Sequence, residues 1–129
     1  MRNFRELRVW DEAHKLTLTL YEDTEEFPRK EMFGLTSQIR RAAASIGANL
    51  AEGCGRQTDG ELSRYVQIAM GPASELEYHL LLSRDLGFIR KSSYEKAQTR
   101  LTSVRKMLMA LHQTLQSSRS AAAKAGSTG

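Results

Sequence analysis

Three histidines and one cysteine are the side chains of this sequence with the clearest capacity for catalysis or metal binding. His14, His79 and His112 fall in three separate predicted helices, and none follows a glutamate by three residues, as the helix-borne ligands of a di-iron bundle do. Asp11 precedes His14 by three residues and Glu75 precedes His79 by four, which is compatible with a metal site. Solvated surface side chains are the interpretation that we favour. We therefore predict no metal, no cofactor and no enzyme.

Cys54 stands between Gly53 and Gly55 at the end of a predicted helix. The helix dipole there opposes thiolate formation instead of lowering the thiol pKa, which argues against a nucleophile. Gly53 to Arg56 is also no phosphate-binding loop, because it follows a helix and lacks the lysine of that motif and its spacing. A single cysteine forms no internal disulfide. We predict no catalytic residue.

One predicted helix, 35–51, carries an unusual polar stripe beside its apolar face. The apolar face comprises Leu35, Ile39, Ala42, Ile46 and Leu50, and the polar stripe comprises Gln38, Arg41, Ser45, Asn49 and Glu52. Glu75 and Glu77 of the next helix supply carboxylates that could meet Arg41 across helices or subunits. Such a stripe fits an internal network, a subunit interface or a ligand site, and we favour the two structural roles because buried polar groups need partners.

Apolar residues at helical spacing predict four helices, at 10–25, 35–51, 58–86 and 92–115. Pro28 ends the first, and Gly53 and Gly55, able to take left-handed conformations, close the second. Capping boxes, Thr58 with Glu61 and Ser92 with Glu95, begin the third and fourth. Gly87 caps the third helix at its C-terminus, and Pro72 should bend it.

These elements predict an all-α, antiparallel up-down four-helix bundle, because the connections are short. A chain of 129 residues with 40% hydrophobic content is one domain. We place the bundle at 1–116 and an unfolded tail at 117–129, where the apolar periodicity stops. No window has the apolar length of a signal peptide or membrane span, so we expect a cytoplasmic protein that binds no membrane.

Positive charge is concentrated in the last third of the chain. Residues 88–129 carry eight Lys or Arg against one acidic residue, Glu95, although the whole chain has a net charge of only +4. The candidate nucleic-acid contacts are Arg90, Lys91, Lys96, Arg100, Arg105 and Lys106, with Arg119 and Lys124 adding reach from the tail. They do not form one helical stripe, so an ordinary solvated surface remains the alternative.

An ordered set of residues between Phe4 and Leu115 resembles a known family. The set comprises Leu7, Trp10, Phe27-Pro28, Glu31, Phe33-Gly34-Leu35, Gln38-Ile39, Arg41-Ala42, Ser45-Ile46, Asn49, Ala51-Glu52-Gly53, Gly55-Arg56, Glu75-Leu76-Glu77 and Leu86-Gly87. The family consists of four-helix-bundle proteins encoded in intervening sequences of large-subunit ribosomal RNA genes, and it includes the accessory variability determinant of diversity-generating retroelements. The resemblance implies a pentamer. For the retroelement branch it also implies a basic scaffold that binds nucleic acid and a reverse transcriptase.

Together these observations predict a non-catalytic homo-oligomeric scaffold. The third helix carries a second apolar set, Ile68, Leu82 and Leu86, away from its core face, which favours a ring-forming oligomer. The leading function is binding of RNA or DNA without sequence specificity. The alternative is a purely structural or protein-interaction module whose basic surface meets an acidic partner. An enzyme with a metal near Glu75, Glu77 and His79 is the third class.

Overall fold

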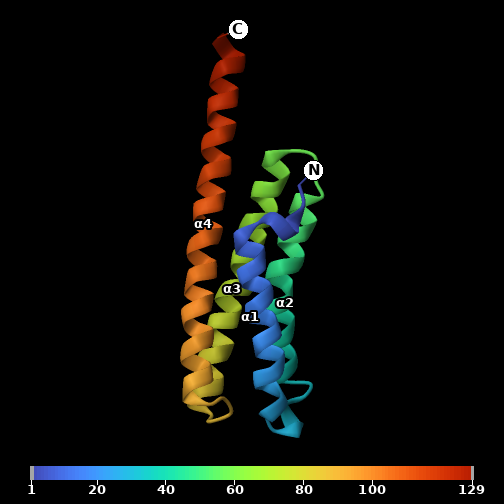
Figure 1. The fold of residues 1–129 in the computed structure, drawn as a ribbon, viewed down its shortest axis with the longest axis vertical. Helices are drawn as coiled ribbons and strands as arrows, with labels where there is room; N and C mark the ends of the chain where they lie inside the picture. Colours follow the sequence, from blue (N-terminus) through green and yellow to red (C-terminus); the bar gives the residue numbers. More distant parts are fainter. Residues whose placement is uncertain (1, 129) are drawn as a thin grey trace.

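The computed structural model describes the backbone of residues 2–128. Beyond Ala121 it describes the side chain of Lys124 and of no other residue. Four α-helices form an antiparallel bundle (Figure 1): α1 (Arg8–Asp23), α2 (Leu35–Cys54), α3 (Asp59–Asp85) and α4 (Lys91–Thr128). Three short 3-10 helices accompany them: η1 (Phe4–Glu6), η2 (Thr24–Glu26) and η3 (Arg29–Glu31). The described residues contain no strand, and the predicted fold class is confirmed.

Leucine, isoleucine, valine and alanine side chains at helical spacing fill the centre of the bundle. The largest fully buried ones are Leu16, Leu20, Ile39, Ile46, Leu50, Leu76, Leu80, Leu101 and Leu108. Ile39, Ile46 and Leu50 belong to the apolar face predicted for 35–51, and the others recur at the same helical spacing on the faces of α1, α3 and α4. Tyr65, Tyr94 and Leu111 lie at the edges of those faces and are only half-buried. No helix among the described residues is long and apolar enough to cross a membrane.

Gly53 lies in the last turn of α2, where that helix packs tightly against α3. A Cβ atom on Gly53 would lie 2.8 Å from Cβ of Tyr65 and 2.9 Å from Cδ1 of Leu62. The predicted left-handed closure of α2 is wrong, because α2 continues to Cys54 and Gly55 has a right-handed φ of −76°. Gly53 therefore serves helix packing instead of helix termination.

The two ends of α3 follow the sequence signals. The Thr58 side chain accepts a hydrogen bond from the Glu61 backbone N–H at 3.1 Å, as the predicted capping box requires. Gly87 has a φ of +76°, and the Phe88 N–H donates to the Ser83 carbonyl at 2.9 Å, which is a Schellman closure. α3 runs through Pro72 without a break in its assigned helix.

The start and the end of α4 differ from the prediction. The Tyr94 N–H donates to the Arg90 carbonyl at 2.9 Å, so the helix begins at Lys91 and Ser92 lies in its first turn. The predicted capping box at Ser92 is therefore wrong. Beyond Ser117, where we expected an unfolded tail, α4 continues to Thr128 and projects past the other helices (Figure 1). Alanine-rich sequence extends an established helix at little entropic cost, since only propagation is needed.

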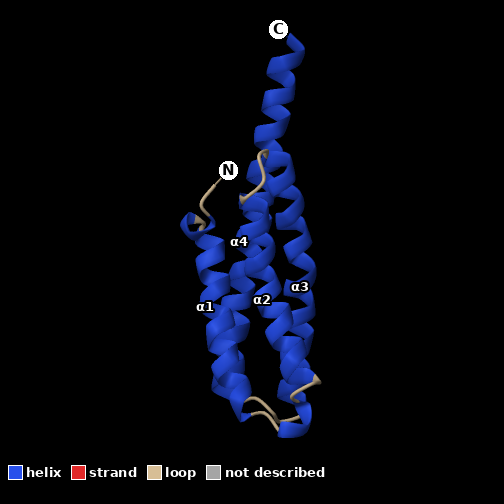
Figure 2. Ribbon diagram, turned by 90° about the vertical axis from the view of Figure 1, so that its right-hand side faces the viewer, coloured by secondary structure: helices blue, strands red, loops and turns tan. Residues whose placement is uncertain are grey.

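The α1–α2 and α3–α4 connections lie together at one end of the bundle, at the bottom of Figure 2. The Phe27 and Phe88 rings are 5.9 Å apart there, and Arg90 binds Glu26 at 2.7 Å. At the opposite end, the Arg2 N–H donates to the Cys54 carbonyl at 2.8 Å and the Arg2 side chain binds Asp59. Residues 33 and 86, far apart in sequence, thus belong to the same end.

The packing of α2 on α3 can be tested with two glycine substitutions in one helix. Gly53→Ala should lower the free energy of unfolding by about 1–3 kcal/mol, because the new Cβ overpacks against α3. Gly47→Ala is the matched control, since its Cβ would reach only the Trp10 ring at 3.4 Å. The control should be unchanged or gain up to about 1 kcal/mol from helix propensity. Urea unfolding at equal protein concentration measures both, and equal effects of the two substitutions would refute the packing role of Gly53.

Candidate functional site

Three of the six predicted phosphate contacts bind carboxylates of the protein itself. The pairs are Arg90 with Glu26 of η2 at 2.7 Å, Arg100 with Glu12 of α1 at 3.6 Å, and Arg105 with Glu77 of α3. Arg100 and Arg105 join α4 to α1 and α3, and Arg90, directly before α4, joins the start of that helix to η2. Their charge is already matched within the chain, so the sequence count overstates the positive charge that α4 offers to a partner.

The three predicted lysines of α4 differ from the arginines. Lys91, Lys96 and Lys106 are exposed, and none forms an ion pair within the described part of the chain. They occupy different sides of α4, so they present separate positive charges instead of one patch.

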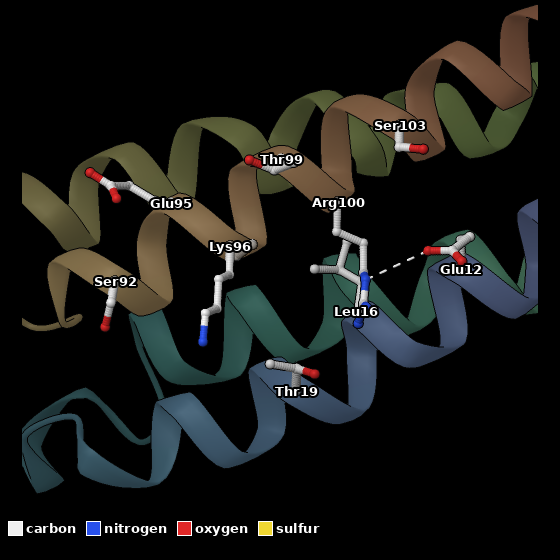
Figure 3. A pocket seen from close by; sticks show the side chains of 10 residues that line it. Glu12, Leu16, Thr19, Ser92, Glu95, Lys96, Thr99, Arg100 and Ser103 are labelled. Carbon is white, nitrogen blue, oxygen red and sulfur yellow. Dashed lines mark ion pairs between the residues drawn. The ribbon is translucent and has the colours of Figure 1, made fainter.

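A groove of about 790 Å³ runs between α1 and α4. Figure 3 shows Lys96 and Arg100 extending from α4 toward α1, whereas Glu95 and Thr99 point away from it. Leu16 forms part of the lining although it is almost fully buried. The groove therefore combines an apolar base with hydroxyl groups, two cations and the carboxylate of Glu12, and its charges nearly balance.

Asp23, at the C-terminus of α1, is a charged group near this groove that the sequence analysis missed. Its Oδ2 atom is buried and has no hydrogen-bond partner among the described residues. Burial, and then the neighbouring carboxylates of Glu22 and Glu26, raise the pKa of Asp23, while a Ser93 hydrogen bond and Lys96 partly oppose this rise. A carboxylate at a helix C-terminus is also disfavoured by the helix dipole.

The polar stripe of α2 does not form an internal network within the chain, which was one of the three interpretations of this stripe. Gln38, Arg41 and Glu52 are exposed, while Ser45 and Asn49 are half-buried. The Asn49 side chain donates to the Ser45 carbonyl at 2.8 Å and to its hydroxyl at 3.1 Å, which stays within α2. Arg41 has no hydrogen bond or ion pair among the described residues. Its side chain is free to meet a partner.

Glu75 and Glu77, predicted to share this network, point in different directions. Glu77 contacts Arg105 on the α4 side of α3, whereas Glu75 lies 3.2 Å from Nε2 of His79. The Glu75 side chain is 59% exposed. Nδ1 of His79 is buried and has no partner among the described residues. The predicted network residues that form side-chain contacts therefore do so in separate places: Ser45 with Asn49, Glu52 with Arg56, Glu75 with His79, and Glu77 with Arg105.

Arg40 is a structural residue that no sequence pattern indicated. Its Nε donates to the Thr24 hydroxyl at 2.9 Å and its second terminal nitrogen to the Tyr21 carbonyl at 3.1 Å. The guanidinium also lies 4.7 Å from the Tyr21 ring centre. Arg40 therefore satisfies groups at the C-terminus of α1, and Arg41 beside it is left for other contacts.

Two exposed apolar surfaces lie on the bundle, one around the start of α2 and one along α3. The first, called the Phe33 surface, comprises Tyr21, Met32, Phe33, Arg40 and Arg41 around a hollow of about 440 Å³. Phe33 is 96% exposed. The second, called the α3 stripe, comprises Ile68, Glu75, Tyr78, Leu82 and Leu86. Ile68, Tyr78 and Leu86 are exposed and Leu82 is partly buried, so the predicted second apolar set lies at the surface.

The groups capable of chemistry do not gather in one place. The Ser63 hydroxyl lies 3.0 Å from Nδ1 of His112, but Ser63 is buried and no described carboxylate contacts His112. The pair is better suited to joining α3 to α4 than to nucleophilic attack. Burial raises the pKa of the Cys54 thiol. Among the described residues, no group of three or more His, Cys, Asp or Glu side chains is placed to hold a metal ion.

The comparison with known families matches residues 5–110, most of the chain, to the family model described as 23S rRNA-intervening sequence protein. The chain belongs to this family. A solved structure with the same fold is a protein of unknown function from the S23 ribosomal protein family of Bacteroides thetaiotaomicron, which is 25% identical with a TM-score of 0.74. The match covers 81% of this chain and 95% of that chain. No curated protein matches the sequence.

Replacing Asp23 should reveal the cost of its burial. A raised pKa means that the folded chain holds the proton more tightly than the unfolded chain, so Asp23 destabilises the fold once the pH rises through that pKa. Asp23→Asn should therefore melt a few degrees above wild type at pH 7. This difference should shrink as the pH falls toward about 3, below the ordinary pKa of an aspartate, where Asp23 is mostly protonated in both the folded and the unfolded chain. Glu25→Gln, an exposed carboxylate of η2, is the control. A lower melting temperature of Asp23→Asn at pH 7 would contradict this account.

Proposed function

We propose that this protein is a non-catalytic scaffold that assembles with copies of itself into a closed ring, a pentamer in the family resemblance. The observation that carries the proposal is the exposure of large apolar side chains on two separate surfaces of one chain. Scattered apolar residues are ordinary on a protein surface, but gathered ones mark interaction sites. An almost fully exposed Phe33 beside Met32 and Tyr21 is such a gathering.

The gain from covering these side chains is large enough to support assembly. Complete burial of a Phe, Leu or Met side chain contributes about 1.5–3 kcal/mol, so a few of them offset the cost of bringing two chains together. The core of the bundle is filled by other residues, and of the apolar side chains on the two surfaces only Leu82 packs partly against it. Self-assembly in the cytoplasm also fits a chain whose single cysteine is a buried free thiol.

A second candidate function is weak binding of RNA or DNA through Lys91, Lys96 and Lys106. Their exposure and lack of an ion partner among the described residues favour it, and several copies in a ring would add their fields. A small number of phosphate contacts per chain gives low affinity with a modest salt dependence. An acidic protein partner would meet the same lysines, and the family resemblance adds a reverse transcriptase as a possible protein partner.

Assembly can be measured directly. Size-exclusion chromatography with light scattering should give a mass of about five times the 14.5 kDa of the chain at micromolar concentration. The mass should fall on dilution only in steps that reflect dissociation of the ring. A mass of one chain across the micromolar range would overturn the proposed function.

Nucleic-acid binding can be tested with a pair of charge-matched variants. Lys96→Glu with Lys106→Glu should abolish a gel shift with RNA or duplex DNA at low salt. Arg8→Glu with Lys15→Glu, which changes the net charge equally on α1, should retain most of it. Wild-type binding should be independent of sequence and should weaken as salt rises, by close to one unit of slope for each phosphate neutralised on duplex DNA. No shift of wild type at micromolar protein would favour a scaffold that binds only proteins.

A further inference from the structure

We infer that the Phe33 surface of one copy packs against the α3 stripe of the next copy, with Arg41 of the first beside Glu75 of the second. The inference rests on the proposed self-assembly and adds which two surfaces meet. It makes the contact head-to-tail, because each copy offers one surface to each of two neighbours. The occupant of both surfaces is thus a second copy of this chain.

The two surfaces carry opposite charges. The hollow of the Phe33 surface is lined by Arg40 and Arg41 and by no acidic side chain. Arg40 is committed to the end of α1, which leaves the guanidinium of Arg41 without a partner in the described chain. The α3 stripe carries the opposite charge at its centre, where the exposed carboxylate of Glu75 stands among apolar side chains. The two surfaces are both apolar and their charges complement each other.

The two surfaces also lie at the same height along the bundle. Gly53 of α2 packs on Leu62 and Tyr65 of α3, and both helices rise about 1.5 Å per residue in opposite directions. Arg41, twelve residues before Gly53, is therefore level with 74–77 of α3, the turn that contains Glu75. By the same count, Leu35 at the start of α2 is level with 80–83, which contains Leu82.

This shared height determines what kind of assembly forms. Because Arg41 lies level with Glu75, and Phe33 lies at the same end as Leu86, two copies can join by rotation about an axis parallel to the bundle, without sliding along it. A head-to-tail contact without translation closes into a ring, whereas one with translation grows into a filament. The Phe33 surface lies around the start of α2 and the α3 stripe lies on the adjacent helix, so successive copies turn steeply and the ring stays small.

The test uses one variant on each surface and a mixture of the two. Phe33→Asp disables the first surface, and Tyr78→Asp, at a side chain that is 59% exposed, disables the second. Each variant alone should run as a single chain. An equimolar mixture should form two-chain complexes, because one intact surface of each kind remains and a single contact can form. Met109→Asp is the control, since Met109 is 55% exposed on α4 outside both surfaces. It should keep the wild-type mass.

Light scattering reads out the masses, and circular dichroism checks that every variant keeps its helices. If both variants dissociate and the mixture stays at one chain, the pairing is overturned while self-assembly stands. A Phe33→Asp variant of wild-type mass overturns it as well, and so does a Tyr78→Asp variant that still assembles. A monomeric wild type would overturn the proposed self-assembly itself. A mixture that fails to form two-chain complexes would overturn only the pairing of these two surfaces.

Discussion

The contact of α2 with α3 at Gly53 fixes the relative height of these two helices. No side chain fits between them at this point, so the two backbones approach more closely than a larger residue would allow. That contact sets the register of α2 against α3. It therefore determines that Arg41 of α2 lies level with Glu75 of the α3 stripe. The Phe33 surface and the stripe could not stand level on one chain if α2 slid by a turn. One glycine therefore links the internal packing to the geometry of assembly.

Half of the predicted basic contact residues at and beside α4 pair with carboxylates of the same chain, which positions this helix in the bundle. Arg90, Arg100 and Arg105 each bind a carboxylate on a different element. Individual exposed pairs of this kind contribute at most about 1 kcal/mol, so they select the orientation of α4 more than they stabilise it. Lys91, Lys96 and Lys106 form no ion pair among the described residues, so their charges face solvent or a partner. A strongly basic segment in the sequence thus becomes a nearly balanced surface with a few separate cations.

Local signals allowed the fold to be predicted, because the features concerned depend on residues close in sequence. Apolar spacing located the four core faces, and Thr58 and Gly87 marked the two ends of α3. The roles of Gly53 and Arg40 could not be inferred in this way, since each depends on a helix that lies opposite only after folding. The charge pattern identified the basic residues of α4. It could not show that Glu12, Glu26 and Glu77 face three of them, because periodicity carries no information on what lies across a helix boundary.

The central claim is that the chain is built to join copies of itself through two different surfaces. Disulfide cross-linking between two singly substituted chains tests it most directly, in a Cys54→Ala background that removes the native thiol. The account predicts that Phe33→Cys chains mixed with Leu82→Cys chains form covalent dimers under mild oxidation, while neither chain alone does so. Cross-linking within one chain is impossible in this arrangement. Equal cross-linking of Phe33→Cys chains with one another, or none in the mixture, would contradict the head-to-tail contact.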